Sequence, residues 1–186
     1  MKRSLSSKVL WVSYVLFALI GAVSPAQSRI WSRNPTNLAQ DYLVINDNRG
    51  HGELVMLIWI ASPMMPNEPA NQMARELLDK YVVVGVVHAH SSKEGIFTFD
   101  QVADIQVDNE DNQPLNLLDT NTTPPAIVGA LATLQSVFGR ALGPMGQGVH
   151  WFAFDSGSVR ACTKGGVSVS FADEKYTYDT PVPGCP

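Results

Sequence analysis

Apolar runs of strand length follow one another along most of the chain, and residues that favour turns separate them. Such runs of roughly five to ten residues match the usual length of β-strands rather than that of helices. The predicted strands are residues 41–47, 53–61, 81–90, 95–99, 103–107, 148–154, 158–162, 167–171 and 175–179, with 114–118 as a further candidate. The chain is therefore expected to be rich in β-structure.

Two of these runs are apolar at almost every position: ELVMLIWIA (53–61) and YVVVGVVHAH (81–90). A strand that is apolar on both faces belongs in the middle of a sheet that is covered on both sides. The short segment NRGHG (48–52) contains two glycines and joins 53–61 to the strand before it. This arrangement predicts a β-hairpin.

Two segments show a helical pattern instead. Residues 69–81 have Pro69 in the first turn, Met73 and Leu77 on one face, and a favourable pair of charges four residues apart. Residues 122–144 begin with threonines and prolines, which suit a helix start, and end in Gly-Pro, which stops a helix. We therefore predict two helices.

The order of these elements indicates the fold class. Strands do not alternate regularly with helices, which argues against a doubly wound parallel sheet. Turn sequences separate the late strands, at 155–157 and 164–166. We predict a single α+β, β-rich domain over residues 29–186, an antiparallel, β-sandwich-like (immunoglobulin-like) domain with two inserted helices.

The first 28 residues differ from the rest. A cationic start is followed by the uncharged apolar run 9–23, then by Ser24-Pro25 and by Ala26-Gln27-Ser28. Small residues after a helix break suit a signal peptidase, so residues 1–28 are predicted to be a signal peptide. The alternative is an uncleaved anchor, because residues 9–28 carry no charge and are about long enough to span a bilayer.

The net charge of the chain argues against some classes of binding partner. Removing residues 1–28 takes away three basic residues and no acids, which leaves 10 basic against 17 acidic residues and a formal charge of −7. An acidic chain without a basic cluster argues against nucleic acid and anionic lipid as partners. With the signal peptide cleaved, we expect a periplasmic or secreted protein without stable membrane insertion.

The chain contains two cysteines, Cys162 and Cys185. In an exported protein an even number of cysteines predicts a disulfide. The 22 residues between them are not the spacing of a redox or zinc motif. We expect a structural bond that fastens the proline-rich C-terminal tail.

The strand 81–90 ends in His88-Ala89-His90, and residues two apart on a strand lie on the same face. Two imidazoles on one face can share a copper or zinc ion. Met64 and Met65, in the proline-rich loop 62–69, add thioethers that suit copper. Against a metal, histidines are common where a buried strand reaches water, and the sequence names neither a third ligand nor a supporting carboxylate.

Three other motifs carry weaker signals. Asp155-Ser156-Gly157-Ser158 resembles the motif of aspartic proteases, but that chemistry needs two such aspartates, and the residues also suit a tight turn. Residues 108–119 resemble a calcium loop, but Gln113 stands where glycine is needed. The glycine-rich 143–148 lacks the Lys-Ser/Thr of a phosphate loop.

The absence of a recognisable catalytic motif favours binding over catalysis. The first functional hypothesis is an exported, non-catalytic binding or assembly-accessory protein that contacts other envelope or secreted proteins and needs no cofactor. Its candidate surfaces are the loop 62–69, with Met64 and Met65, and the link 143–150, with Met145, because each joins methionine to proline or glycine.

Two alternatives remain open. One is a periplasmic copper- or zinc-binding module that uses His88 and His90. The other is a hydrolase whose site is assembled from scattered residues, of which His51, His150 and Asp155 are candidates because they flank loops at strand ends. Sequence alone does not show whether these side chains meet.

Overall fold

The computed structural model describes residues 43–46, 52–119, 121 and 123–185 of the chain. Its strands are β1 (Leu43–Asn46), β2 (Glu53–Ile60), β3 (Tyr81–Ser91), β4 (Phe97–Phe99), β5 (Gln106–Asn109), β6 (His150–Asp155), β7 (Gly165–Phe171) and β8 (Glu174–Thr180). Its helices are the 3-10 turns η1 (Ser62–Met64) and η2 (Pro69–Asn71), and α2 (Gln72–Lys80), α3 (Pro125–Ala141) and α4 (Pro144–Gln147).

The larger sheet is built around β3. Its order is β1-β2-β3-β4, and β6 also pairs with β3, so β4 and β6 follow one another along the same edge. All pairings in this sheet are antiparallel. The predicted β1–β2 hairpin and the central position of β2 and β3 are confirmed.

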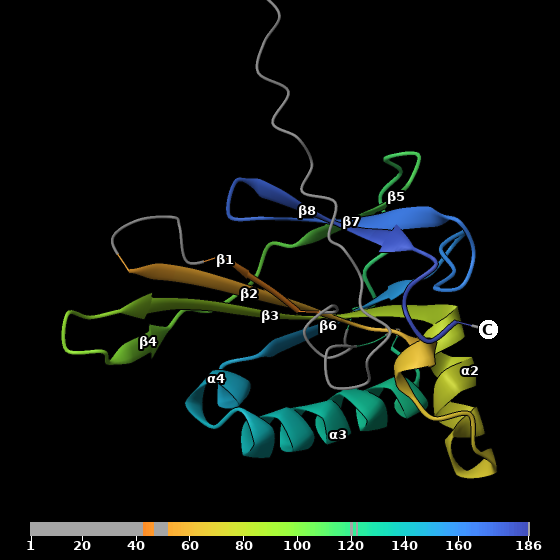
Figure 1. Ribbon diagram of the computed structural model, residues 1–186, viewed down its shortest axis with the longest axis horizontal. Helices are drawn as coiled ribbons and strands as arrows, with labels where there is room; N and C mark the ends of the chain where they lie inside the picture. The colour runs from red at the N-terminus through yellow and green to blue at the C-terminus, as the bar shows by residue number, and fades with distance from the viewer. Residues whose placement is uncertain (1–42, 47–51, 120, 122, 186) are drawn as a thin grey trace, which may run out of the picture.

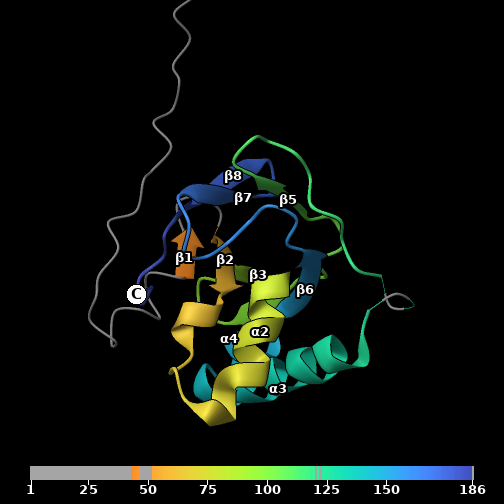
Figure 2. The ribbon, with the colours of Figure 1, turned by 90° about the vertical axis from the view of Figure 1, so that its right-hand side faces the viewer.

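The smaller sheet has the order β5-β7-β8 and is also antiparallel. It lies over one face of the larger sheet, while α2, α3 and α4 lie on the other side (Figures 1 and 2). The predicted α+β, antiparallel, sandwich-like fold is confirmed. The immunoglobulin-like topology stays a prediction, and the signal peptide lies outside the described residues.

The alternation of side chains along β3 explains why its sequence is apolar throughout. Val82, Val84 and Val86 belong to a core between the two sheets, together with Trp59 and Tyr178. The intervening valines belong to a second core, which includes side chains of α2 and α3. Because a layer covers each face of β3, valine is favourable at both the even-numbered and the odd-numbered positions of the strand.

Gly85 interrupts this run of valines for a packing reason. A Cβ atom at this position would lie 2.7 Å from the ring of Trp151 and 2.9 Å from a methyl of Val149. The indole of Trp151 therefore takes the volume that a side chain at residue 85 would need, and it packs edge-on against Phe138 of α3 at a centroid distance of 5.1 Å.

Three sequence-based assignments were wrong. Residues 114–118 make only isolated bridges to Asp108 and Phe154, and 158–162 form a turn. Arg160 donates hydrogen bonds to the carbonyls of Gly157 and Val159, which closes this segment into a turn. Gly165-Gly166, expected in a turn, belong to β7.

The disulfide is present. Cys162 and Cys185 are bonded, with their Cα atoms 5.4 Å apart. The tail is also held by a backbone hydrogen bond from Val182 to Ala161, and Val182 is buried. The predicted fastening of the C-terminal segment is confirmed. Within the described part of the chain, no helix is long and apolar enough to cross a membrane.

Candidate metal-binding site

His88 and His90 lie on the face of β3 that points toward the smaller sheet, near the end of the strand. Strand register brings two acidic residues to the same place. Glu53, the first residue of β2, stands opposite His90. Asp100 directly follows β4, and its backbone N–H donates to the carbonyl of His88 at 2.9 Å.

The four side chains form a continuous chain of polar contacts. His90 Nε2 lies 2.9 Å from Asp100 Oδ2, and His88 Nδ1 lies 3.2 Å from the same oxygen. The other ring nitrogen of His88, Nε2, lies 2.9 Å from Glu53 Oε1. Both imidazoles therefore converge on a single carboxylate oxygen, and a second carboxylate fixes the orientation of His88.

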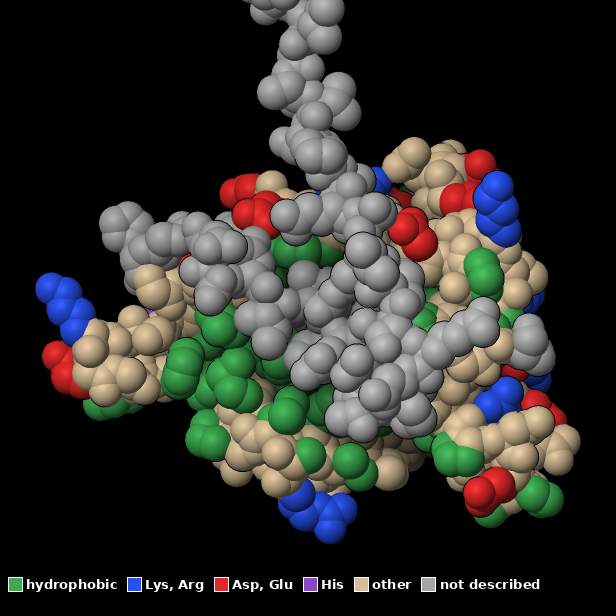
Figure 3. All heavy atoms as spheres, viewed as in Figure 1, with side chains coloured by type: hydrophobic (Ala, Val, Ile, Leu, Met, Phe, Trp, Pro, Cys, Tyr) green, Lys and Arg blue, Asp and Glu red, His purple; other side chains and the backbone are tan. Residues whose placement is uncertain are grey.

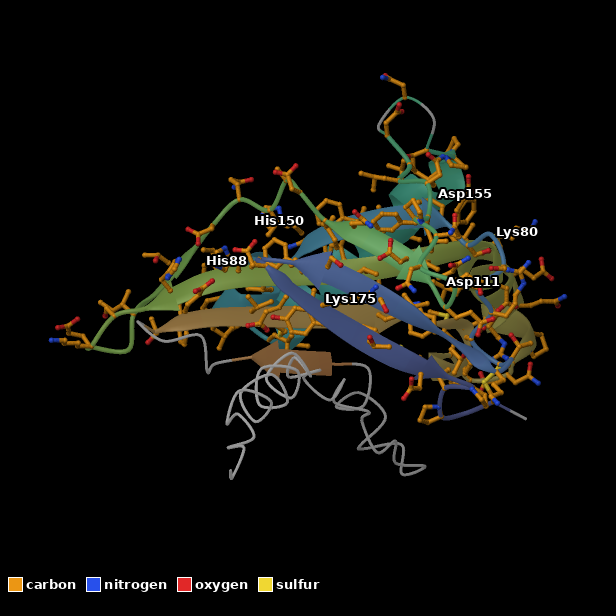
Figure 4. The ribbon with its side chains drawn as sticks, turned by 90° about the horizontal axis from the view of Figure 1, so that it is seen from above. Lys80, His88, Asp111, His150, Asp155 and Lys175 are labelled. Carbon is orange, nitrogen blue, oxygen red and sulfur yellow. A yellow bond between two sulfur atoms is a disulfide. The ribbon has the colours of Figure 1, made fainter. Side chains whose placement is uncertain are left out.

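The site lies at the rim of the core between the sheets. The side chain of His88 is 20% exposed, while those of Asp100 and His90 are 41% and 46% exposed. Phe171, the last residue of β7, packs edge-on against the ring of His88 at a centroid distance of 5.6 Å. Viewed from above, His88 lies beside the end of the β7–β8 hairpin (Figure 4). A small ion could reach the site from solution.

The spacing of the donor atoms suits a transition metal. One ligand atom each from His88, His90 and Asp100 lie within 4.8 Å of one another. Tetrahedral zinc, with bonds of about 2.0–2.2 Å, places its ligand atoms about 3.4 Å apart. The contacts of 2.9 and 3.2 Å need to open by only a few tenths of an ångström to admit the ion.

Glu53 supplies the support that histidine ligands usually have. A ligating histidine commonly donates its second ring N–H to a carboxylate, which fixes the tautomer and raises the basicity of the ligand. If His88 Nε2 donates to Glu53, then Nδ1 is left to face Asp100 and an ion beside it. Asp100 and Glu53 thus lie where a third ligand and a supporting carboxylate would be needed.

The same contacts can also be explained without a metal ion. Without a metal, they are ion pairs at the surfacing end of a strand, and exposed pairs of this kind contribute about 0–1 kcal/mol each. Ion pairing does not require two imidazoles to share one carboxylate oxygen while a second carboxylate holds the remaining nitrogen. The same convergence is the arrangement that a shared metal ion would need.

The turn before β4 helps to place Asp100. The hydroxyl of Ser92 accepts hydrogen bonds from the backbone N–H groups of Glu94 and Ile96, and Ser92 also pairs with Ile96 through the backbone. The same hydroxyl lowers the pKa of the Glu94 carboxyl. This closed turn fixes the register between β3 and β4 and so the position of Asp100.

His150 lies near the site, while Asp155 does not. The first residue of β6, His150, stands opposite Val86 and therefore on the same face as His88. Asp155 pairs with Tyr81 at the other end of β6, about 17 Å away along a strand. The structure does not bring these two hydrolase candidates together, and His51 lies outside the described residues.

The methionines lie elsewhere. Met64 lies just beyond the C-terminal end of β2, whereas Glu53 is at the N-terminal end of that strand. Met64 packs against both cores. Met65 is half-buried beside it. Met145 packs in the helix-side core, on the other face of the larger sheet. None of the three joins the histidines, and the partial burial of Met64 and Met145 reduces the apolar surface that these loops offer to a partner.

The other motifs serve structural roles. Ser156 of the Asp155–Ser158 turn is buried, and its hydroxyl accepts a hydrogen bond from Arg160. In the acidic segment 108–119, Lys175 Nζ lies 2.7 Å from Asn112 Oδ1 and 3.4 Å from Asp108 Oδ2. A lysine ammonium thus takes the place that a calcium ion would need.

Comparisons with known protein families, with curated proteins and with solved structures give no match. Function is therefore argued from the geometry of the site alone.

Proposed function

We propose that this protein is an exported metal-binding protein that holds one zinc or copper(II) ion with His88, His90 and Asp100. Glu53 orients His88 through its Nε2. The observation that carries the proposal is the convergence of both imidazoles on Asp100 Oδ2, at 2.9 and 3.2 Å.

The chemical types of the candidate ligand atoms favour some metal ions over others. Imidazole nitrogen and carboxylate oxygen suit zinc and copper(II), whereas copper(I) prefers thiolate and thioether ligands. Both cysteines are held in the disulfide. Met64 and Met145 pack elsewhere, as described above. Copper(I) should therefore bind weakly, and copper(II) should bind more tightly than zinc, following the general order of affinity for divalent metals.

Calorimetric titration of the purified protein tests the proposal. We expect one ion per chain with a Kd of about 1 µM or tighter, which corresponds to about 8 kcal/mol of binding free energy. His88→Ala and His90→Ala should each abolish measurable binding. Asp155→Asn is the matched control, because it removes an exposed acid at the far end of β6.

The proposal fails if neither zinc nor copper(II) gives heat with a folded protein. It also fails if both histidine variants bind as tightly as the wild type. In either case, His88 and His90 would be ion-paired residues at the end of a strand.

A role in contacting other envelope or secreted proteins is a second candidate. The observation that favours it is that several large apolar side chains on β4, on α3 and in the turns beside them are exposed: Ile96, Phe97, Val128, Val137 and Leu142. Exposed hydrophobic side chains are where a partner protein can bury apolar surface. Figure 3 shows hydrophobic side chains on this part of the molecule. Val137→Ser should leave the fold intact and weaken chemical crosslinking to a partner, and unchanged crosslinking would count against this surface.

A further inference from the structure

The edges of the two sheets are not covered equally. The backbone N–H of Leu118 donates to the carbonyl of Ala153 on the outer edge of β6, and that of Leu115 donates to the carbonyl of Val107 on the outer edge of β5. The segment between β5 and α3 therefore lies along both of these edges. The remaining edge strands of the larger sheet, β1 and β4, are short, with four and three described residues.

Strand β8 is the long edge strand that such a segment does not cover. It has seven residues, and among the described residues it pairs only with β7. Its register with β7 runs without a bulge, and it contains no proline. Bulges and prolines are devices that commonly block an exposed edge, and an edge without them offers a row of N–H and C=O groups to another strand.

The hairpin between β7 and β8 determines which backbone groups face this edge. Phe171 pairs with Glu174 across the two-residue turn Ala172-Asp173, and both turn residues have positive φ. The pair that closes such a turn is hydrogen-bonded, and hydrogen-bonded pairs then alternate along the ladder. The even-numbered residues of β8 therefore bond to β7. The odd-numbered residues point their N–H and C=O groups away from it: Lys175, Thr177 and Asp179.

The side chains of these three residues lie on the outer face of the smaller sheet, because the tyrosines that alternate with them point into the core. Figure 4 looks down on the smaller sheet and labels Lys175. Asp179 is exposed and stands opposite Gly166, so no side chain faces it across β7. Lys175 Nζ lies 2.7 Å from Asn112 Oδ1 and 3.4 Å from Asp108 Oδ2. An ammonium carries three N–H donors, so it can also bind a carboxylate beyond the edge.

We propose that two copies of this chain associate through β8, antiparallel about a twofold axis at Thr177, so that their smaller sheets form one continuous sheet. In this register Thr177 stands opposite Thr177 of the second copy, and Lys175 of each copy stands opposite Asp179 of the other. Every outward N–H and C=O group of the three residues is then paired.

Charge complementarity is the reason to assign this edge to a second copy of the chain. Opposite charges and paired threonines are favourable neighbours across two strands, whereas like charges are unfavourable. A shift of the register in either direction leaves outward groups unpaired and no longer places Lys175 opposite Asp179. The sequence of β8 is thus complementary to itself in the register that makes the most hydrogen bonds.

Sedimentation velocity of the purified protein over a series of protein concentrations tests the proposal. EDTA in the buffer excludes association through a bound ion. We expect a monomer at low concentration and a species of twice its mass at high concentration. Thr177→Pro should abolish the dimer and keep the fold, because it removes an N–H that points away from β7. Thr177→Val keeps this N–H, so it is the matched control and should still dimerise.

Exchange of the two charges tests the register. Asp179→Lys should weaken dimerisation about 10-fold or more, because it places lysine opposite lysine. Lys175→Asp places aspartate opposite aspartate and should weaken dimerisation to a similar extent. An equimolar mixture of the two variants should restore the dimer, because each pair between unlike copies again has opposite charges.

Three results would overturn the proposal. The first is a protein that stays monomeric at every concentration. The second is a dimer that persists in a folded Thr177→Pro variant, since the contact would then lie elsewhere. The third is a mixture of the two charge variants that dimerises no better than either variant alone, which would exclude antiparallel pairing about Thr177. The proposal does not depend on metal binding, so none of these results bears on the calorimetric titration with zinc or copper(II).

Discussion

Replacement of Asp100 by asparagine is the sharpest perturbation of the proposed site. The substitution keeps the size of the side chain and removes its charge. It removes the carboxylate on which both imidazoles converge, at 2.9 and 3.2 Å. An amide oxygen can still accept hydrogen bonds, but it is a poor ligand for zinc. The histidines would remain in place, because β3 and its neighbours position them.

The expected effect on stability can be worked out from the affinity. A ligand that binds only the folded protein at 100 times its Kd stabilises it by about 2.7 kcal/mol. For a domain of this size, each kcal/mol raises Tm by about 2–4 °C, so 100 µM zinc should raise Tm by about 5–11 °C if the Kd is about 1 µM. If Asp100→Asn weakens binding 100-fold, the same zinc contributes about 0.4 kcal/mol and about 1–2 °C.

Differential scanning calorimetry with zinc or with EDTA measures both shifts directly. The variant without metal should lie within about 1 kcal/mol of wild type, because its lost ion pairs are partly exposed. Asp104→Asn serves as the matched control, since Asp104 is an exposed acid on the same segment and outside the ligand group. A full zinc shift in Asp100→Asn, or no shift in wild type, would refute the reasoning.

Other changes test separate parts of the structure. Glu53→Gln should weaken zinc binding about 10- to 100-fold in a calorimetric titration, because it removes the carboxylate that orients a ligand; an unchanged Kd would refute this role. Replacing Cys162 and Cys185 by serine should lower the free energy of unfolding by about 3 kcal/mol in urea, from the entropy of a loop of this length; retained stability would show that the tail is held by packing alone. Gly85→Ala should destabilise the fold by about 1–3 kcal/mol through its clash with Trp151, and a neutral result in the same urea assay would mean that the indole can move aside.

Local sequence patterns were sufficient to predict much of the fold. The valine run of β3 marks a strand buried on both faces, and two layers do cover it. The β1–β2 hairpin follows from its turn residues, and the disulfide follows from the number of cysteines. The segment 158–162 misled because Val159 and Ala161 alternate as in a strand, yet the side chain of Arg160 bonds to the turn itself.

The sequence predicted only two of the four side chains in the candidate site. His88 and His90 are adjacent on one strand, so their common face can be read from the spacing. Glu53 and Asp100 reach them only through strand pairing with β2 and β4, and register between strands is a property of the folded chain. The available signal was their position, since Glu53 begins an apolar run and Asp100 ends one.

A crystal structure of the protein grown with zinc, with anomalous diffraction recorded on both sides of the zinc absorption edge, tests the central claim most directly. The account predicts one strong anomalous peak about 2.0–2.2 Å from His88 Nδ1, His90 Nε2 and a carboxylate oxygen of Asp100, with Glu53 still in contact with His88 Nε2. A zinc ion bound at other residues, or the four side chains unchanged and without a peak at saturating zinc, would contradict it.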